Sequence, residues 1–504
     1  MAALSKIKKV VFRASSLKQL AAWVVATLCI MVLSVDASAV TSSTANGSAP
    51  DCQSGTSVKQ GFTRLYIALR NSQDGSGTSA DDARDGSSPE KFDRILRCYS
   101  EGCNDPAAPK KSISKTDNLI VCLGPGTFRT EGGYDHVIDV PHSSNRGFTL
   151  GKGLKIHGSG ADNTIVQLSS YLPARTVPNP HNVPAGTATG VVFSTSSDDA
   201  SDIEVSDLTI DDNYPELKSR ASKDGIKALN LEAVQLRSDR GHNWIHDINV
   251  LHTSGEIGII DEKWETFPVW IYSAKVGTLP QANVDNVIER VNMSSYGGGQ
   301  CTAIAVANAV AEVRNNKVDG YQIGYGGWAL GPAHFHDNVA MGTEYGFNID
   351  SLVNRGVVIE RNLILHPRKC GIVIGGSATY ADFLIKDNTI QIDQSGVIGL
   401  VFQGNVTGAL VEGNSFLWRG QSSFGSFFSS PTAIKNFSAR SAGVNQKNSY
   451  QNNKISSNLK VTFNGPSRKS DSCFFQNHDE SGKALGPLPD SNKTACTASS
   501  GSAR

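Results

Sequence analysis

Residues able to bind or process a sugar chain recur at matching positions in short alternating segments between residues 234 and 403. In each segment, alternate apolar residues predict a strand with one buried face, so the residues between them face solvent. The outward residues are, in order, Gln235/Arg237, Trp270/Tyr272, Ala305/Ala307, Gly324/Gly326, Asn348/Asp350, Val373/Gly375 and Val401/Gln403. The two pairs of small residues predict the floor of a groove. Aromatic rings and a cation would rise on one side, and an amide and a carboxylate on the other.

These residue types suit a carbohydrate, because sugar faces stack on aromatic rings and hydroxyls pair with polar groups. The candidate substrate-binding residues are Gln235, Trp270, Tyr272, Asn348, Glu262 and Trp328, and the candidate catalytic residues are Arg237, Lys263, His252 and Asp350. Glu262, Lys263 and His252 belong to long loops of the N-terminal half that we expect nearby. The alternative is that the small residues only permit tight strand packing and that the polar residues are solvated.

Two reaction types are open for such a groove. A polysaccharide lyase needs a cation that neutralises the uronate and a base that takes the proton at C5. Arg237 would be that cation, and Lys263 or His252 that base. A glycoside hydrolase needs two placed carboxylates, and Asp350 alone does not supply them.

The elements that must position these residues are short strands in a repeat that is clearest between residues 311 and 416. Each copy has the order aliphatic, polar, aliphatic, polar, any residue, Asn, any residue, aliphatic. The repeated residues are Asn316, Asn338, Asn362, Asn388 and Asn414, spaced by 22, 24, 26 and 26 residues. This period is typical of the stacked coils of a parallel β-helix. An Asn at a fixed place in successive coils predicts a ladder, in which each amide donates to one neighbour and accepts from the other.

The position of the repeated Asn, which we call the ladder slot, recurs in both directions along the chain. Asn453 predicts a sixth rung after a long insertion, and Leu208, Ile248 and Val291 occupy the slot upstream at spacings of 40 and 43 residues. We therefore predict an all-β chain of coils with three short strands and three bends each. The regular half is C-terminal, and the N-terminal half carries large loops.

Residues 1–39 have the pattern of a secretory signal. Basic residues precede an apolar run at 21–35 that is short for a membrane span, and Ala37-Ser38-Ala39 forms a small-x-small cleavage site. The alternative is an uncleaved anchor. Residues 40–62 predict a disordered leader rich in Ser, Thr and Gly. We expect a secreted, periplasmic or cell-surface protein that has no membrane contact after cleavage of the signal.

The net charge and the number of cysteines limit the kinds of binding partner and the cellular compartment that we expect. Of 47 basic and 47 acidic residues, the mature chain keeps 42 and 46, which argues against nucleic acid as a partner. Eight cysteines remain after the signal, a number that permits disulfides in an exported protein. Cys98/Cys103 and Cys473/Cys496 are close enough in sequence to pair, and Cys122 and Cys370 are expected to be buried thiols. The pairing and the oligomeric state are not readable from the sequence.

We expect an N-terminal cap at residues 63–117, a β-helix at 118–464 and a C-terminal tail at 465–504. Within the cap, a helix is predicted at about 89–99. Ser88 is placed to cap it, Pro89 suits its first turn, and Phe92, Ile95 and Leu96 share one face. A helix here would cover the open end of the coil, as terminal repeats require.

The segments Leu123–Phe128 (LGPGTF) and Gly153–Gly160 (GLKIHGSG) resemble the opening coils of the pectin-lyase-like superfamily. Together with the ladder, the resemblance covers roughly Thr63–Asn464 and is closest to uncharacterised secreted members. It implies a right-handed, single-stranded parallel β-helix whose substrates lie along the sheet after the ladder strands. The superfamily includes polysaccharide lyases, polygalacturonase-type hydrolases, epimerases and phage tailspikes.

Two motifs of that superfamily are incomplete in this chain. Val269-Trp270-Ile271 resembles the start of the pectate-lyase motif Val-Trp-Ile-Asp-His, but Tyr272 and Ser273 replace its Asp and His. No cofactor is therefore expected, although calcium stays possible. Asn348-Ile349-Asp350 resembles the Asn-Thr-Asp of polygalacturonases, whose other motifs are not recognisable here.

Two further clusters have metal-like patterns. His334 and His336 share an outward face at metal-ligand spacing, but His336 falls in a column with Glu360, Lys386 and Glu412, which favours an alternating-charge surface ladder without a metal. Asp211-Asp212-Asn213 follows a strand and more commonly caps a turn than binds calcium.

The sequence favours a secreted β-helix protein that binds and cleaves a polysaccharide as a lyase or glycoside hydrolase. The alternative is a non-catalytic glycan-binding, surface or matrix protein that uses the same groove. The fold alone does not decide between them, because many activities share it.

Overall fold

The computed structural model describes residues 52, 60–70, 74–104, 112–113, 115–133, 147–173, 186–195, 201–237, 239–255, 266–273, 285–296, 301–328, 331–350, 354–420, 430–437, 445, 447–464 and 472–486. All of them lie in one compact unit, Gly47–Arg504. The predicted signal, most of the predicted leader, Glu262, Lys263 and most of the predicted tail lie outside the described residues.

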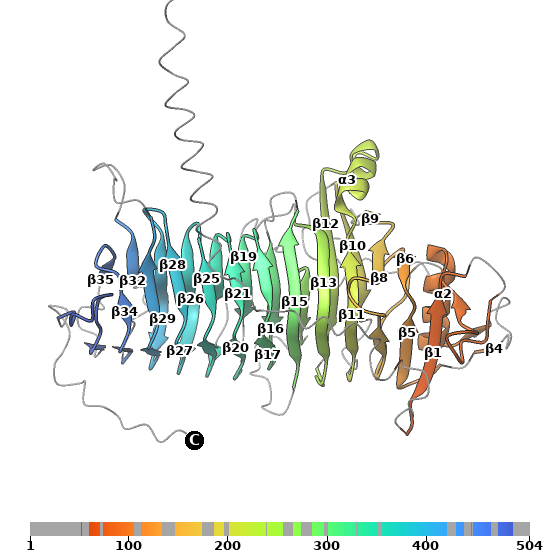
Figure 1. The fold of residues 1–504 in the computed structure, drawn as a ribbon, viewed down its shortest axis with the longest axis horizontal. Coiled ribbons are helices and arrows are strands. Elements are labelled where there is room, and N and C mark those ends of the chain that lie inside the picture. Colours follow the sequence, from red (N-terminus) through yellow and green to blue (C-terminus); the bar gives the residue numbers. More distant parts are fainter. Residues whose placement is uncertain are drawn as a thin grey trace, which may run out of the picture. The chain divides into compact units, whose positions relative to one another are not determined.

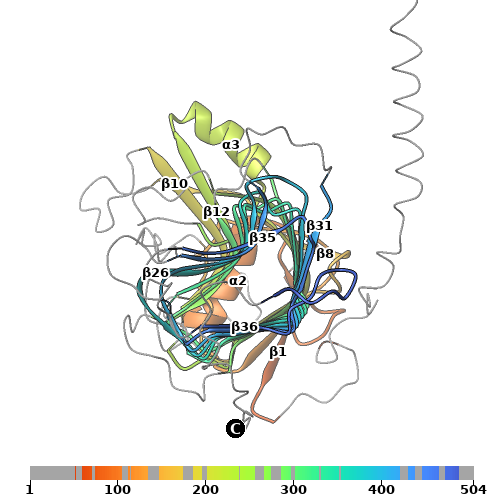
Figure 2. The same ribbon diagram turned by 90° about the vertical axis from the view of Figure 1, so that its left-hand side faces the viewer.

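The described chain is a parallel β-helix, in which strands one coil apart pair in parallel register (Figure 1). Three sheets surround the core, and Figure 2 looks along the coil axis. The first sheet contains β1 (Thr63–Ala68), β5 (Leu119–Leu123), β7 (Lys155–His157), β17 (Glu312–Arg314), β20 (His334–His336), β24 (Val358–Glu360), β27 (Leu384–Lys386), β30 (Leu410–Glu412), β33 (Ser449–Gln451) and β36 (Cys473–Phe475). The second contains β6 (Gly126–Thr130), β8 (Thr164–Leu168), β18 (Lys317–Asp319), β21 (Val339–Met341), β25 (Leu363–Leu365), β28 (Thr389–Ile392), β31 (Ser415–Trp418) and β34 (Lys454–Ile455).

Three long strands run through the first and second sheets without a break: β11 (Glu204–Asp211), β13 (Trp244–Gly255) and β15 (Val287–Ser295). The third sheet contains β10 (Thr187–Ser194), β12 (Ala228–Arg237), β14 (Val269–Tyr272), β16 (Thr302–Ala307), β19 (Ile323–Trp328), β22 (Tyr345–Ile349), β26 (Cys370–Ala381), β29 (Ile398–Thr407), β32 (Thr432–Phe437) and β35 (Lys460–Asn464). Short strands β2 (Arg84–Asp85), β9 (Leu172–Pro173) and β23 (Asn354–Arg355) join these edges, and β3 (Cys103–Asn104) pairs with β4 (Ser112–Ile113).

The predicted asparagine ladder forms between the first and second sheets. Each Asn Nδ2 donates to the next Asn Oδ1 at 2.9–3.0 Å, and the rungs are Asn316, Asn338, Asn362, Asn388, Asn414, Asn453 and Asn477. Each Oδ1 also accepts the backbone N–H of the rung before it, as Asn362 does from Asn338 at 3.0 Å. The second Nδ2 proton goes to a backbone carbonyl of the preceding coil, such as Phe335 O at 3.0 Å. The buried amides therefore have no unpaired donor, which a dry bend requires.

A residue with positive φ precedes each ladder slot. Asp207, Asp247, Arg290, Asn315, Asp337, Arg361, Asp387, Asn452 and Gln476 have φ between 51° and 57°, and Gly413 has φ 67°. The left-handed conformation costs a non-glycine residue roughly 1–2 kcal/mol. The ladder hydrogen bonds offset this cost, so the bend and the ladder form together. Upstream, Leu208, Ile248 and Val291 align in the same slot, and Val291 N–H donates to Asn316 Oδ1 at 2.9 Å.

The β-helix begins earlier and ends later than the sequence predicted. β1 pairs with β5 from Thr63 onward, so the stack starts before residue 118. β36 pairs with β33, and Asn477 adds a rung to Asn453, so it continues past residue 464. Both errors have one cause: single terminal coils carry too few repeats to show a period.

The predicted capping helix is present as α2 (Pro89–Glu101). The Ser88 side chain accepts a hydrogen bond from Lys91 N–H, and Pro89 occupies the first turn. Phe92, Ile95 and Leu96 are buried, and the Phe92 ring lies 5.3 Å from that of Phe128 on β6. The second described helix, α3 (Tyr214–Lys223), packs on β12 and β13. With 13 and 10 residues, neither described helix is long enough to cross a membrane.

The disulfides correct one cysteine prediction. Cys98 pairs with Cys103, as the sequence suggested, but Cys122 pairs with Cys52 across 70 residues and is not a thiol. Cys52 lies in the segment predicted as a disordered leader, where sequence proximity gave no sign of this long-range bond. Cys370 is a buried thiol, as expected, and burial raises its pKa to about 11. Cys473 is disulfide-bonded, and Cys496, which the sequence suggested as its partner, lies outside the described residues.

The ladder yields a stability prediction. In Asn362→Ala, the Asn338 side chain and backbone N–H lose their acceptor, Phe335 O loses the Asn362 Nδ2 donor, and Asn388 Oδ1 keeps only the backbone N–H of residue 362. Buried polar groups left unpaired cost about 1–3 kcal/mol each, so we expect a loss of at least about 3 kcal/mol in urea unfolding. Asn405→Ala is the control, because its Nδ2 makes one exposed 3.3 Å contact with Thr379. It should change stability by less than about 0.5 kcal/mol. Equal losses in the two variants would contradict the role of the ladder.

A second prediction concerns Asp93, which joins α2 to β6 by accepting from Thr130 Oγ1 at 2.6 Å and Glu131 N–H at 2.8 Å. Burial raises the pKa of Asp93 to about 7, although both hydrogen bonds lower it. In the unfolded chain the carboxyl ionises near pH 4. The stabilisation is therefore complete below about pH 4 and is lost as the pH rises to about 7. Asp93→Asn should flatten this part of the profile of unfolding free energy against pH. The exposed Asp81→Asn should leave the slope as in the wild type.

Candidate functional site

The register of the third sheet differs from the sequence alignment at one coil. The alignment placed Ile304 and Val306 opposite Ile323 and Tyr325. In the structure Thr302 pairs with Ile323 and Ile304 with Tyr325, a shift of two residues. Gly326 therefore follows Ala305 in its column, and Trp328 follows Ala307.

The error arose because the strands bend at their first small residue. Gly324, Gly346, Gly371 and Gly399 stack in one column, and a Cβ on any of the first three would lie 2.5–2.8 Å from the carbonyl oxygen of the next coil's residue. The residue before each glycine consequently turns outward. Tyr345 and Cys370, for example, cluster with the outward residues Val373 and Val401. A strict alternation of two gives no sign of this bend.

Four aromatic rings cover the small residues that were predicted to form a floor. We call Phe267, Trp270, Tyr272 and Trp328 the aromatic patch. The Phe267 ring centroid lies 5.0 Å from those of Trp270 and Trp328, and Trp270 stacks on Tyr272 at 3.9 Å. Ala305 is buried in the same cluster. The small residues thus leave room for rings, and the predicted open floor is wrong.

A column of partly exposed side chains runs along the outward face of the third sheet. In successive coils, Arg237 pairs in register with Tyr272, Tyr272 with Ala307, and Ala307 with Trp328. Asp350 continues the column in the next coil, where its backbone N–H donates at 3.1 Å to the O atom of Gly327, one residue before Trp328. All but the buried Ala307 are partly exposed. Beside the column, Asn348 follows Gly326 in register and donates from Nδ2 to Asp350 Oδ2 at 2.8 Å. We call Arg237, Tyr272, Trp328, Asn348 and Asp350 the third-sheet column.

Two predicted binding residues lie beneath this surface. Gln235 is fully buried and donates to Glu232 Oε2 at 2.6 Å, so it orients a buried carboxylate and does not face solvent. Trp270 is also buried, and its indole N–H has no acceptor among the described residues. An acceptor that reaches this N–H would remove the cost of a buried unpaired donor.

Among the described residues, the predicted catalytic residues Arg237, His252 and Asp350 are not brought together. His252 Nδ1 contacts Asp211 Oδ1 at 2.8 Å, and its ring contacts Tyr296. The strand that carries His252 meets β12 at Leu231, six residues before Arg237, or roughly 20 Å along the strand. Arg237 and Asp350 are four coils apart, roughly 19 Å. Lys263 lies outside the described residues. Asp211 caps its turn by accepting from Asn213 N–H at 2.8 Å.

Sequence reasoning missed Glu232 and Phe267. Both stand two residues before the first inward residue of their strands, the position that the bend turns outward. The available signal was the type of residue. A carboxylate at an apparently inward position, Glu232, argues that the alternation does not hold there.

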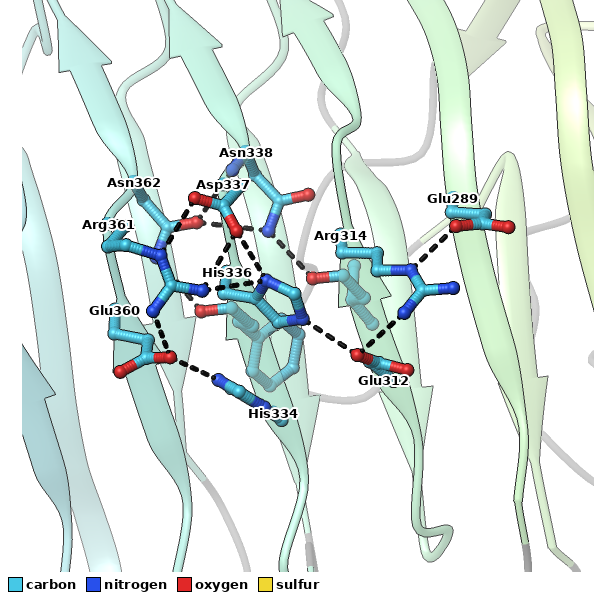
Figure 3. Close-up of polar contacts among 12 residues, drawn as sticks. Glu289, Glu312, Arg314, His334, His336, Asp337, Asn338, Glu360, Arg361 and Asn362 are labelled. Carbon is cyan, nitrogen blue, oxygen red and sulfur yellow. Dashed lines mark hydrogen bonds and ion pairs between the residues drawn. The ribbon is translucent and has the colours of Figure 1, made fainter.

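The first sheet carries the predicted charge ladder on its outward face. Arg314, His336, Glu360, Lys386 and Glu412 are in parallel register. Figure 3 shows the centre of this ladder, where ion pairs run from coil to coil. Arg314 bridges Glu289 at 2.6 Å and Glu312 at 3.0 Å, and Arg361 contacts Asp337 at 2.9 Å.

Within the ladder, Glu312, His334 and His336 offer ligand atoms that lie within 4.8 Å of one another. His336 Nε2 contacts Glu312 Oε1 at 2.8 Å, and its Nδ1 contacts Asp337 Oδ2 at 2.6 Å (Figure 3). His334 Nε2 contacts Glu360 Oε1 at 3.0 Å. Burial and the charge of His336 lower the pKa of His334. Burial alone would raise the pKa of Glu312, but the hydrogen bond from His336 and the charge of Arg314 outweigh it and lower that pKa.

The chain matches no protein-family model and no curated protein. Similar solved structures include the A-module of mannuronan C-5 epimerase AlgE6 from Azotobacter vinelandii, with 14% identity, 71% of this chain and 90% of that chain covered, and a TM-score of 0.34. A tailspike protein mutant of E. coli bacteriophage HK620, in complex with a pentasaccharide, has 9% identity, coverage of 82% and 78%, and a TM-score of 0.43. The described strands form the parallel β-helix that the sequence predicts.

The packing of the aromatic patch generates a prediction. Ala305→Leu adds atoms beneath the rings of Phe267 and Trp328, where Ala305 is buried. Overpacking of this kind costs about 1–3 kcal/mol, so we expect such a loss in urea unfolding. An open floor would accept the leucine without cost. Ala381→Leu is the matched control, since Ala381 ends β26 half-buried, and it should stay within about 0.5 kcal/mol of the wild type.

Proposed function

We propose that this chain is an exported protein that binds a polysaccharide along the third-sheet column. The observation that carries the proposal is the alignment of one cation, two aromatic rings and an amide-carboxylate pair in consecutive coils of a rigid sheet. Strands hold their side chains at a fixed spacing of roughly 4.8 Å, which gives an extended ligand a row of regularly placed contacts.

Each member of the column suits one part of a sugar chain. Tyr272 and Trp328 are two coils apart and partly exposed, so each presents a ring for stacking with a sugar face. Arg237 at one end would pair with a carboxylate or hydroxyl. Asn348 and Asp350, joined at 2.8 Å, would accept and donate at the other end. The indole N–H of Trp270, whose ring stacks on Tyr272, has no acceptor among the described residues and offers a further donor.

The proposal also includes cleavage of the bound polysaccharide, by a lyase or a hydrolase reaction. Arg237 and Asp350 are too far apart to act on one glycosidic bond, so they would contact different sugar units. A lyase reaction would need Arg237 with Lys263 as the base, and a hydrolase would need a second carboxylate near Asp350. The geometry of the described residues therefore favours binding over cleavage.

Export is part of the same proposal. Disulfides persist mainly in oxidising compartments, and the chain forms Cys52–Cys122 and Cys98–Cys103. The signal-like N-terminus adds a second, independent argument.

The test measures binding and cleavage on a panel of uronate-containing and neutral polysaccharides. We expect the mature chain to bind at least one of them, and Tyr272→Ala and Trp328→Ala each to weaken binding by about tenfold, or 1.4 kcal/mol. Asp350→Asn keeps the side-chain shape and should also weaken binding. New ultraviolet-absorbing ends would identify a lyase, and new reducing ends without absorbance would identify a hydrolase.

Tyr296→Ala is the control, because Tyr296 is an exposed tyrosine on the outside of the stack, away from the third-sheet column. It should bind as the wild type does. Thermal melts identify any variant that fails to fold. Wild-type affinity in Tyr272→Ala, Trp328→Ala and Asp350→Asn together would overturn the proposed binding face.

A further inference from the structure

We propose that Glu312, His334 and His336 bind one transition-metal ion, of the Zn²⁺ class, on the outward face of the first sheet. The three residues come from neighbouring strands β17 and β20, which pair in register with Glu312 opposite His334. Their ligand atoms lie within 4.8 Å of one another. This site is separate from the third-sheet column and does not depend on glycan binding.

The two ring nitrogens of His336 have different neighbours. Nδ1 lies 2.6 Å from Asp337 Oδ2 and 3.3 Å from Arg361 Nη2. Nε2 lies 2.8 Å from Glu312 Oε1. A histidine nitrogen and a carboxylate oxygen therefore meet at one point, as two ligand atoms of a single ion do.

Outer contacts hold the ligands as they do in established metal sites. A metal-bound histidine commonly donates its other ring N–H to a carboxylate, which fixes its orientation. His336 has Asp337 in that place, and Asp337 is itself held by Arg361 at 2.9 and 3.0 Å. His334 contacts Glu360 at 3.0 Å, and Glu360 also pairs with Arg361 (Figure 3). Both histidines thus have a carboxylate partner outside the proposed ion.

The ligand set selects the class of metal. Two imidazoles and one carboxylate suit Zn²⁺ and its first-row neighbours, whereas Ca²⁺ and Mg²⁺ prefer oxygen ligands. Around a tetrahedral zinc, ligand atoms are about 3.3 Å apart. The Glu312 and His334 side chains are 35% and 37% exposed, so the cluster is open to solvent and to an ion from it.

A second histidine-carboxylate cluster on the same sheet shows the contrast. His246 contacts Glu204 at 3.2 Å and Asp247 at 2.7 Å, and Arg290 holds Asp247, as Arg361 holds Asp337. There, however, the Lys155 ammonium contacts Glu204 at 2.6 Å and supplies the cation from the chain itself. At Glu312 the neighbouring cation is Arg314, which contacts Glu312 Oε1 at 3.0 Å and also bridges to Glu289 at 2.6 Å. Among the described residues, the difference between the clusters is therefore that Glu312, His334 and His336 bring three ligand atoms within 4.8 Å of one another.

The test uses tag-free mature protein freed of metal with a chelator, then titrated with Zn²⁺ by calorimetry and with Co²⁺ by visible absorption. We expect one ion per chain, a tetrahedral Co²⁺ spectrum, and a higher melting temperature in the loaded protein. His334→Gln and Glu312→Gln should each weaken binding by at least about tenfold. Asp337→Asn, which removes only the outer carboxylate, should weaken it by about 10–100-fold.

His366→Gln is the control, because His366 is an exposed histidine paired with Asp393 at 2.8 Å, outside this cluster. It should bind Zn²⁺ as the wild type does. The isosteric Glu312→Gln keeps the test valid if a histidine variant fails to fold. No Zn²⁺ binding by the wild type up to about 1 mM, or wild-type affinity in both His334→Gln and Glu312→Gln, would overturn the site and leave only a protonated charge ladder.

Discussion

The structure depends on one buried side-chain amide repeated once per coil. A coil of this chain must bend sharply between its first and second strands, and it does so through a residue of positive φ that is seldom glycine. The bend would leave backbone groups unpaired in a dry interior. The following asparagine pairs them, with both amide protons and the carbonyl oxygen used. Because each rung bonds to the next coil, no coil satisfies its own bend, and stability comes only from stacking.

This arrangement turns the outside of the stack into columns of side chains. Residues far apart in sequence, such as Arg237, Tyr272 and Trp328, become neighbours because their strands share a register. A rigid column is a good scaffold for an extended ligand, since it fixes the spacing of contacts before binding occurs. It also limits catalysis, because residues at opposite ends of a column cannot converge on one bond. The same rule that favours glycan binding here argues against Arg237 and Asp350 as a catalytic pair.

The first and third sheets use their outward columns differently. The third sheet places aromatic rings over Ala305, which buries part of the predicted groove. The first sheet alternates acids, bases and histidines, so that most charges have partners in the coils above and below. Exposed pairs of this kind add little stability individually. Their effect is to hold His334 and His336 in defined orientations, a condition for binding a metal.

The sequence alone determined the coil, the ladder and the capping helix. These features depend on local patterns: a 22–26-residue repeat of Asn, and Ser88-Pro89 before an apolar face. It also determined the column that contains His336, where strand register follows directly from the ladder.

Tertiary structure decided the surface of the third sheet, the Cys52–Cys122 bond and the burial of Gln235 and Trp270. For the third sheet, the physical reason is the bend at Gly324 and its equivalents, which turns the preceding residue outward and shifts one coil by two residues. For the disulfide, the reason is that coil stacking brings together cysteines 70 residues apart. The alternation of apolar and polar residues within a strand does not reveal that bend, because the bend depends on the carbonyl oxygen of the neighbouring coil. Contacts between coils, and not within them, decide which residues face outward in the third-sheet column.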